Sequence, residues 1–175
     1  MASALHNLSV YDESSLEDSS EFHFGIAVSD WNAQITHALY TGCIETLLKH
    51  GVLEDRIRTV QVPGAFELPQ AARMLLGGGK LDAVICLGCV IRGETAHNEY
   101  INHAVAQGLT TLSLTTGKPV IFGVLTPDDE QQGLDRAGGK HGNKGVEAAV
   151  TGLRMAALAK SMKKPEERTI GFSGR

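Results

Sequence analysis

The segment that most constrains the fold of this chain is a long apolar run, residues 82–91, which leads through a short turn into a helical pattern. The run is rich in Val and Ile, holds no proline and shows little polar alternation, which is typical of a parallel strand buried on both faces. We expect Gly93 to take a positive φ and turn the chain into a helix whose N-cap is Thr95. That helix would bury Tyr100, Ile101, Ala104 and Val105. A strand that passes directly into a helix predicts an open α/β sheet.

The same unit of a strand and a helix occurs four times along the chain. Strands are predicted at residues 22–29, 57–62, 82–91 and 119–126. Helical spacing of apolar residues predicts a helix after each strand, the fourth at about residues 128–137. A last helix would carry Val146, Ala149, Val150, Leu153 and Ala157 on one face. Because such units require right-handed crossovers, the predicted fold class is α/β, a flavodoxin-like three-layer α/β/α sandwich with a four-stranded parallel sheet.

Length and charge predict one domain with an acidic leader. A chain of 175 residues, of which 42% are hydrophobic, can form one substantial core. Residues 1–21 carry a charge of −5 and no Lys or Arg, which leaves +1 on residues 22–175 against the total of −4. We expect residues 1–21 to be flexible or to pair with a neighbouring subunit, residues 22–162 to form the domain, and residues 163–175 to form a surface tail.

Composition also argues against several classes of function. Near-neutral charge on residues 22–175 argues against nucleic acid binding, which needs a basic face. No apolar run is long enough to cross a bilayer and the N-terminus lacks a secretory pattern, so we expect a cytoplasmic protein that does not bind a membrane. Cys86 and Cys89 form a CxxC pair within a strand, without further ligands at zinc spacing and away from a helix N-terminus. We interpret both as core residues and expect no metal.

The end of the third predicted strand has the chemistry of an anion-binding and proton-transfer site. Unpaired amides in the first turn of a helix attract phosphate, and His97 in that turn would stay neutral and exchange protons near pH 7. The carboxyl ends of parallel strands share one edge, so Trp31, Phe66 and Glu67 would gather there as well. Plainer explanations exist for each: a solvated His97, a Trp31 that packs at a helix entrance, a core Phe66 and a first-turn charge at Glu67. Their common edge favours a single cleft.

Five segments together resemble the lumazine synthase family, in the right order from about residue 22 to residue 162. They are SDWN at residues 29–32, VPGAFELP at 62–69, LGCVIRGETAHNEY at 87–100, PVIFGVLT at 119–126 and LDRAGGKHGNKG at 134–145. The resemblance implies condensation of 5-amino-6-(D-ribitylamino)uracil with 3,4-dihydroxy-2-butanone 4-phosphate, which yields 6,7-dimethyl-8-ribityllumazine, phosphate and water. It also implies that the reaction needs no metal or organic cofactor.

The resemblance assigns roles to residues at matching positions. The pyrimidine and its ribityl chain would contact Trp31, Ala65, Phe66, Glu67, Cys89, Val90, Ile91 and Phe122. The phosphate would be held by Glu94, Thr95 and Arg136, with help from Lys144. His97 would be the catalytic proton-transfer residue. Phe122 and Arg136 are expected from the adjacent subunit.

The resemblance further implies a homopentamer, and in some members of the family a 60-subunit shell with riboflavin synthase as a further partner. The turn at residues 138–145 has no insertion and the N-terminal segment has no proline, which favours the shell. Ala96, Cys89 and Asp135 depart from the residues that are frequent at these positions and could shift affinity. Three alternatives stay open: a flavodoxin-like flavin or nucleotide-binding module, a non-catalytic shell protein, and a protein that binds riboflavin as a product-like ligand.

Overall fold

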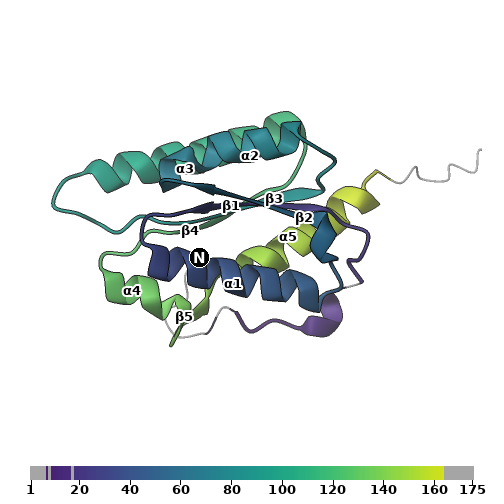
Figure 1. Ribbon diagram of the computed structural model, residues 1–175, viewed down its shortest axis with the longest axis horizontal. Coiled ribbons are helices and arrows are strands. Elements are labelled where there is room, and N and C mark those ends of the chain that lie inside the picture. The colour runs from purple at the N-terminus through teal and green to yellow at the C-terminus, as the bar shows by residue number, and fades with distance from the viewer. Residues whose placement is uncertain (1–6, 8, 17, 164–175) are drawn as a thin grey trace, which may run out of the picture.

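Four parallel strands form the central sheet, as predicted. The computed structural model describes residues 7, 9–16 and 18–163. The strands are β1 (Phe24–Ser29), β2 (Ile57–Val62), β3 (Ala83–Cys89) and β4 (Val120–Leu125), in the order β2-β1-β3-β4. All three strand pairings are parallel. Helices cover both faces of this sheet, which confirms the three-layer α/β/α sandwich (Figure 1).

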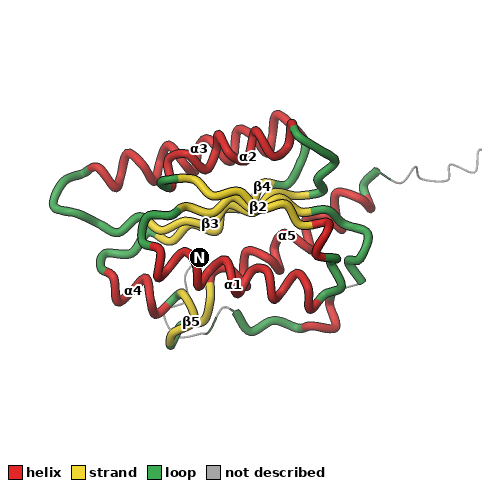
Figure 2. The backbone as a smooth tube through the Cα atoms, in the orientation of Figure 1, coloured by secondary structure: helices red, strands yellow, loops and turns green. Residues whose placement is uncertain are grey.

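The helices divide between the two faces of the sheet. Helices α2 (Leu68–Gly77) and α3 (His97–Thr116) cover one face, and α1 (Ala33–Lys49), α4 (Glu130–Asp135) and α5 (Lys144–Ser161) lie on the other (Figure 2). Short 3₁₀ helices precede β1, β2 and α2, at η1 (Glu13–Ser15), η2 (Glu54–Arg56) and η3 (Ala65–Glu67). Each strand is thus followed by a helix, which brings all four carboxyl ends to one edge.

The two central strands account for the continuous apolar runs in the sequence. Every residue of β1 and β3 is buried, because each strand has a neighbour on both sides and helices on both faces. Cys86 packs in the cluster beneath α2 and α3, while Cys89 packs in the cluster beneath α1 and α5. Their exposed fractions are 0% and 3%. The interpretation of this CxxC pair as core residues is therefore confirmed, and the two side chains lie on opposite faces of the sheet.

The start of α3 differs from its prediction. Ala96, not Thr95, is the N-cap, and its side chain offers no capping oxygen. Tyr100, predicted to be buried, is 75% exposed. The reason is helical geometry: Val105 and Leu109 are the buried residues of α3, and Tyr100 precedes Leu109 by two and a half turns, which places it on the opposite side.

A short hairpin near the C-terminus was not predicted. The predicted helix at residues 128–137 is shorter, and β5 (Ala137–Gly139) and β6 (Gly142–Asn143) follow it as an antiparallel pair. Gly138 and Gly142 supply the positive φ values, 109° and 84°, that the turn needs. Asn143 then caps α5, since its side chain accepts from the Gly145 amide at 2.7 Å and donates to the Ala38 carbonyl of α1 at 2.9 Å.

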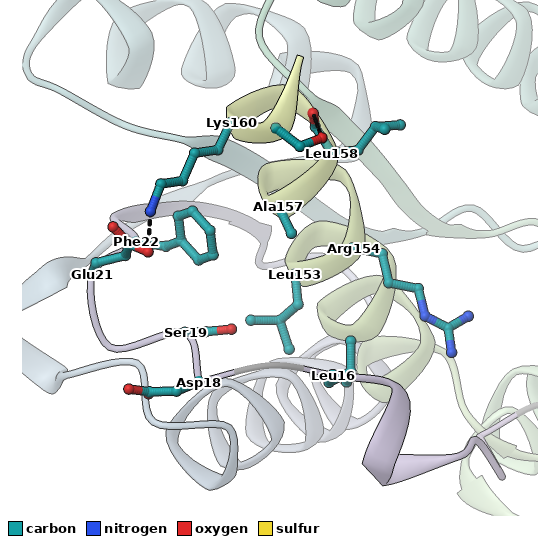
Figure 3. A pocket seen from close by; sticks show the side chains of 11 residues that line it. Leu16, Asp18, Ser19, Glu21, Phe22, Leu153, Arg154, Ala157, Leu158 and Lys160 are labelled. Atoms are coloured by element: carbon teal, nitrogen blue, oxygen red, sulfur yellow. Dashed lines mark hydrogen bonds and ion pairs between the residues drawn. The ribbon is translucent and has the colours of Figure 1, made fainter. Parts of the chain in front are cut away.

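The described part of the N-terminal segment contacts residues that lie far away in the sequence of the same chain. Tyr11 hydrogen bonds to His50 at 2.9 Å, and Ser9 Oγ donates to the Asn143 carbonyl at 3.1 Å. Near the amino end of β1 this segment and α5 line a cavity of about 370 Å³. Lys160 and Glu21 form an ion pair beside that cavity (Figure 3). Of the predicted C-terminal tail, residues 164–175 lie outside the described residues, and within the described part of the chain no helix is suited to span a membrane.

Candidate functional site

Backbone hydrogen bonds continue past the carboxyl ends of the strands and hold the following loops together. The Trp31 amide donates to the Pro63 carbonyl at 3.0 Å, which ties the exit of β1 to the exit of β2. The Val90 and Arg92 amides donate to the carbonyls of Leu125 and Pro127, both at 2.9 Å, which ties the exit of β3 to the exit of β4. These bonds extend the strand pairing into the loops at the edge where the sequence predicts the candidate site.

Trp31 and Phe66 present aromatic faces to solvent at this edge. Their exposed fractions are 67% and 55%, so Phe66 is not the core residue of the plainer explanation. The indole lies directly over Gly64: a Cβ there would stand 2.8 Å from Cε3 of Trp31. Glu67 Oε2 accepts a hydrogen bond from the Gly64 amide at 3.0 Å. An aromatic face, a backbone without a side chain and a carboxylate thus lie side by side, which suits a flat polar ring.

The loop between β3 and α3 is open to solvent. Glu94, Thr95 and His97 are all exposed, and His97 is the first residue of the 20-residue helix α3. The first amides of a helix lack helical acceptors and carry the positive end of its dipole, so this turn can bind an anion. Gly93 does not have the positive φ that we expected. Nothing lies within 4 Å of a Cβ placed at Gly93, and the chain bends at Glu94 and Thr95 rather than at this glycine.

Arg136 belongs to a charge cluster that the sequence only partly indicated. Its Nη1 donates to the His141 carbonyl at 2.8 Å, and its Nη2 lies 2.8 Å from Oε1 of Glu147. Lys144 Nζ lies 3.1 Å from the other oxygen of Glu147. Glu147 was not among the predicted site residues. Its spacing of three residues after Lys144 on a helix was the signal that could have revealed it.

The Asp135 carboxyl and the two thiols of β3 have pKa values shifted from their ordinary values. Asp135 pairs with Lys140 at 2.9 Å, and hydrogen bonds from Lys140 and Gln131 hold the pKa of this carboxyl below its ordinary value. Burial raises the pKa of Cys86 to about 12 and that of Cys89 to about 11. Both thiols are therefore protonated at neutral pH. Among the described residues, no group of three or more acidic, His or Cys side chains is arranged to hold a metal.

A single chain does not bring all predicted site residues together. Phe122 lies in the middle of the edge strand β4, paired with Cys86, and is 38% exposed. It shares a strand face with Val120 and Val124, on the side of α2 and α3. Arg136 is on the other side of the sheet, because β5 packs on α1 (Figure 1). Trp31, Ala65, Phe66, Glu67 and the residues from Cys89 to His97 share the carboxyl edge.

Comparison with known proteins identifies the family of the chain. The 6,7-dimethyl-8-ribityllumazine synthase family matches residues 21–160 of the chain. The 6,7-dimethyl-8-ribityllumazine synthase of Porphyromonas gingivalis is 52% identical over 158 residues, which cover 90% of this chain and 98% of that protein. The enzymes of the same name from Cytophaga hutchinsonii and Parabacteroides distasonis are 53% and 52% identical, over 90% and 89% of this chain and 98% and 97% of theirs. The chain therefore belongs to the 6,7-dimethyl-8-ribityllumazine synthase family.

Proposed function

We propose that this protein is a transferase that condenses 5-amino-6-(D-ribitylamino)uracil with 3,4-dihydroxy-2-butanone 4-phosphate. The products are 6,7-dimethyl-8-ribityllumazine, phosphate and water, in the penultimate step of riboflavin biosynthesis. The observation that carries the proposal is the juxtaposition, at one sheet edge, of the exposed Trp31 face with the open first turn of α3 that bears His97. A ring-stacking surface and an anion site are the two recognition elements that these two substrates need.

The pyrimidine half of the site lies at the exits of β1, β2 and β3. Trp31 stacks on the ring, and Glu67 with the backbone of Ala65 and Phe66 holds the ribityl hydroxyls. Cys89, Val90 and Ile91 line the ring pocket chiefly through backbone groups, because the Cys89 side chain is buried. Phe122 of a neighbouring subunit closes the pocket. The mid-strand position of Phe122 in its own chain supports this shared arrangement.

The phosphate half combines the α3 turn with a cationic cluster. The amides at Glu94 and Thr95 bind phosphate oxygens, helped by the positive end of a long helix. Arg136 of a neighbouring subunit adds a guanidinium that can hold two phosphate oxygens at once. Lys144 adds a second positive charge, and Glu147 fixes both cations in place through its two oxygens.

His97 moves the protons of the reaction. The amine of the pyrimidine attacks the ketone and water leaves; elimination of phosphate and ring closure with loss of a second water follow. The substrate supplies its own amine, so no lysine Schiff base is required. Holding both substrates in one orientation and transferring protons at the reacting centre account for the acceleration. His97 is exposed at the start of α3, within the same turn that binds phosphate.

The assembly proposed is a homopentamer, with each site shared between two neighbouring subunits, that can build a 60-subunit shell with riboflavin synthase as a partner in the cytoplasm. The separation of Phe122 and Arg136 from the carboxyl edge within one chain supports shared sites. Native mass spectrometry distinguishes five chains from sixty. Refolding an equal mixture of His97→Asn and Arg136→Ala chains should restore about a quarter of the sites, because a site then needs one intact residue from each of two neighbours. No recovery above the unmixed variants would refute shared sites.

Turnover tests the proposal against its alternatives. Purified protein mixed with both substrates should form lumazine, followed by its absorbance, faster than buffer alone. A flavin-binding module would bind riboflavin without accelerating this reaction, and a non-catalytic shell protein would assemble without accelerating it. The presence of both His97 and Arg136 in one chain favours the enzyme over these two alternatives.

A further inference from the structure

Asn32 has a backbone conformation that side-chain-bearing residues rarely adopt. Its φ is 61° and its ψ is 46°, in the left-handed region, and it is the sole non-glycine residue with a positive φ in the described part of the chain. Asn tolerates this region better than most residues, but the conformation still costs energy relative to glycine. A residue held in this way directly beside Trp31 calls for an explanation from its contacts.

The side chain of Asn32 does not cap α1, although Asn32 is the N-cap residue of that helix. Asn32 is the N-cap residue of α1, where Asn commonly accepts a hydrogen bond from the first turn, yet it makes no such side-chain bond. Its Nδ2 instead donates to the backbone carbonyl of Cys89 at 3.0 Å, across 57 residues of sequence. Its own carbonyl starts the helix by accepting from the Ile35 and Thr36 amides at 2.9 and 3.0 Å.

This bond joins the two sides of the proposed ring pocket. Trp31, the neighbour of Asn32, is fixed to the exit of β2 through the Pro63 carbonyl at 3.0 Å. Cys89 ends β3 and leads into Val90 and Ile91. The Asn32 amide is therefore the side-chain link between the stacking face and the strand whose backbone faces the edge of the ring. Loss of this hydrogen bond would allow the spacing between the Trp31 face and the end of β3 to vary, although both surfaces would remain.

We propose that Asn32 is a positioning residue, which sets the gap between the Trp31 indole and the end of β3 and so sets affinity for the pyrimidine substrate. The inference rests on the proposed function. It predicts an effect on one substrate only, because Asn32 has no contact with the α3 turn or with the Arg136 hairpin among its hydrogen bonds. A role confined to folding would change stability and affect both substrates alike.

Two substitutions separate the hydrogen bond from the backbone conformation. Asn32→Gly adopts a left-handed φ freely but lacks the amide, and Asn32→Asp tolerates the same φ but offers an oxygen where the donor stood. Gln34→Glu is the matched control, since it adds the same charge to the exposed first turn of α1 without touching Cys89. Thermal melts of all three variants establish that they fold.

The measurement is ligand binding at Trp31 together with the kinetics of each substrate. Trp31 is the only tryptophan of the chain, so quenching of its emission by 6,7-dimethyl-8-ribityllumazine reports the pocket directly. Both Asn32 variants should bind this product about five- to tenfold more weakly and raise the KM of the pyrimidine substrate by a similar factor. The KM of the phosphate substrate and all constants of Gln34→Glu should stay within about twofold of wild type.

Failure of the positioning role of Asn32 can be distinguished from failure of the proposed function. Wild-type turnover with unchanged product affinity in both folded Asn32 variants would overturn the positioning role alone. An equal rise in both KM values would also overturn it. A wild-type protein that neither binds the product nor accelerates the reaction would overturn the proposed function, and this inference with it.

Discussion

The Arg136 guanidinium lies 2.8 Å from the Glu147 carboxylate, and Lys144 approaches the other oxygen of the same carboxylate at 3.1 Å. The exposed fractions of these three side chains, 22%, 13% and 28%, show that solvent screens the cluster only in part. One carboxylate between two cations leaves a net positive charge. Glu147 thus holds both cations in a fixed orientation, which is what the phosphate role proposed for Arg136 requires.

Loss of the Glu147 carboxylate should loosen Arg136 and Lys144 without removing either cation. We expect Glu147→Gln to raise the KM of the phosphate substrate about three- to tenfold, and Arg136→Ala to raise it about tenfold to a hundredfold, since charge-assisted bonds are stronger. Steady-state kinetics with each substrate varied in turn measures this. Glu130→Gln, at an exposed position of α4, is the control. Equal effects on the two substrates would count against the phosphate role.

A methyl group at Gly64 should displace the Trp31 ring. The added Cβ would stand 2.8 and 2.9 Å from Cε3 and Cζ3 of the indole, while the φ of −135° is open to alanine without strain. We expect Gly64→Ala to weaken product binding about tenfold with little change in melting temperature. Fluorescence titration gives the affinity. Gly79→Ala, where nothing lies within 4 Å of the new Cβ, should bind like wild type.

Substitution of His97 should slow the chemistry rather than weaken binding. Asparagine keeps polarity and similar size but cannot exchange a proton near neutral pH, so His97→Asn should lower kcat about a hundredfold, a typical value for general acid or base catalysis. Both KM values should change little. His103→Asn, an exposed position on the same helix, is the matched control. A His97→Asn variant with wild-type kcat would remove His97 from the mechanism.

The buried thiols predict a pH dependence of stability. Unfolded cysteines ionise near pH 9.0, whereas burial raises the pKa of Cys86 to about 12 and of Cys89 to about 11. The folded chain therefore keeps protons that the unfolded chain loses above pH 9, and the contribution of each thiol is fully present below that pH. As pH rises towards these folded values the unfolding free energy should fall by at most about 1.4 kcal/mol per pH unit and thiol.

Two measurements check the behaviour of these thiols. Urea unfolding midpoints should drop more steeply between pH 8 and pH 10.5 for wild type than for a Cys86→Ala variant. Iodoacetamide at pH 8 should label the native chain far more slowly than the urea-unfolded chain. Rapid labelling of native Cys86 or Cys89 would contradict their burial.

The sequence predicted the sheet well because buried parallel strands leave a strong pattern. Residues 57–62 form β2 as predicted, and the apolar run at 82–91 contains β3. The hairpin at 137–143 escaped prediction since three of its residues are glycines, which carry no apolar period. The residue type of Tyr100 does not predict its exposure, because an aromatic residue on a helix is usually buried. Only its position around the helix relative to the buried Val105 and Leu109 shows that it faces solvent.

The positions of the candidate residues at one sheet edge could be predicted, because strand order fixes which loops meet there. The shared edge of β1, β2 and β3 placed Trp31, Phe66, Glu67 and His97 without any knowledge of side-chain contacts. The pairing of Arg136 with Glu147 and the bond from Asn32 to Cys89 depend on side-chain orientation across distant segments. Local sequence carries little information on such contacts, so these two required the structure.

The initial rate of lumazine formation from the two substrates tests the central claim most directly. Absorbance of 6,7-dimethyl-8-ribityllumazine is followed with wild-type protein, with His97→Asn and with buffer, because the substrates also react spontaneously. We predict a wild-type rate that exceeds the spontaneous rate, grows in proportion to protein concentration and falls towards the spontaneous rate in His97→Asn. A wild-type rate equal to that of buffer at every protein concentration would contradict the account.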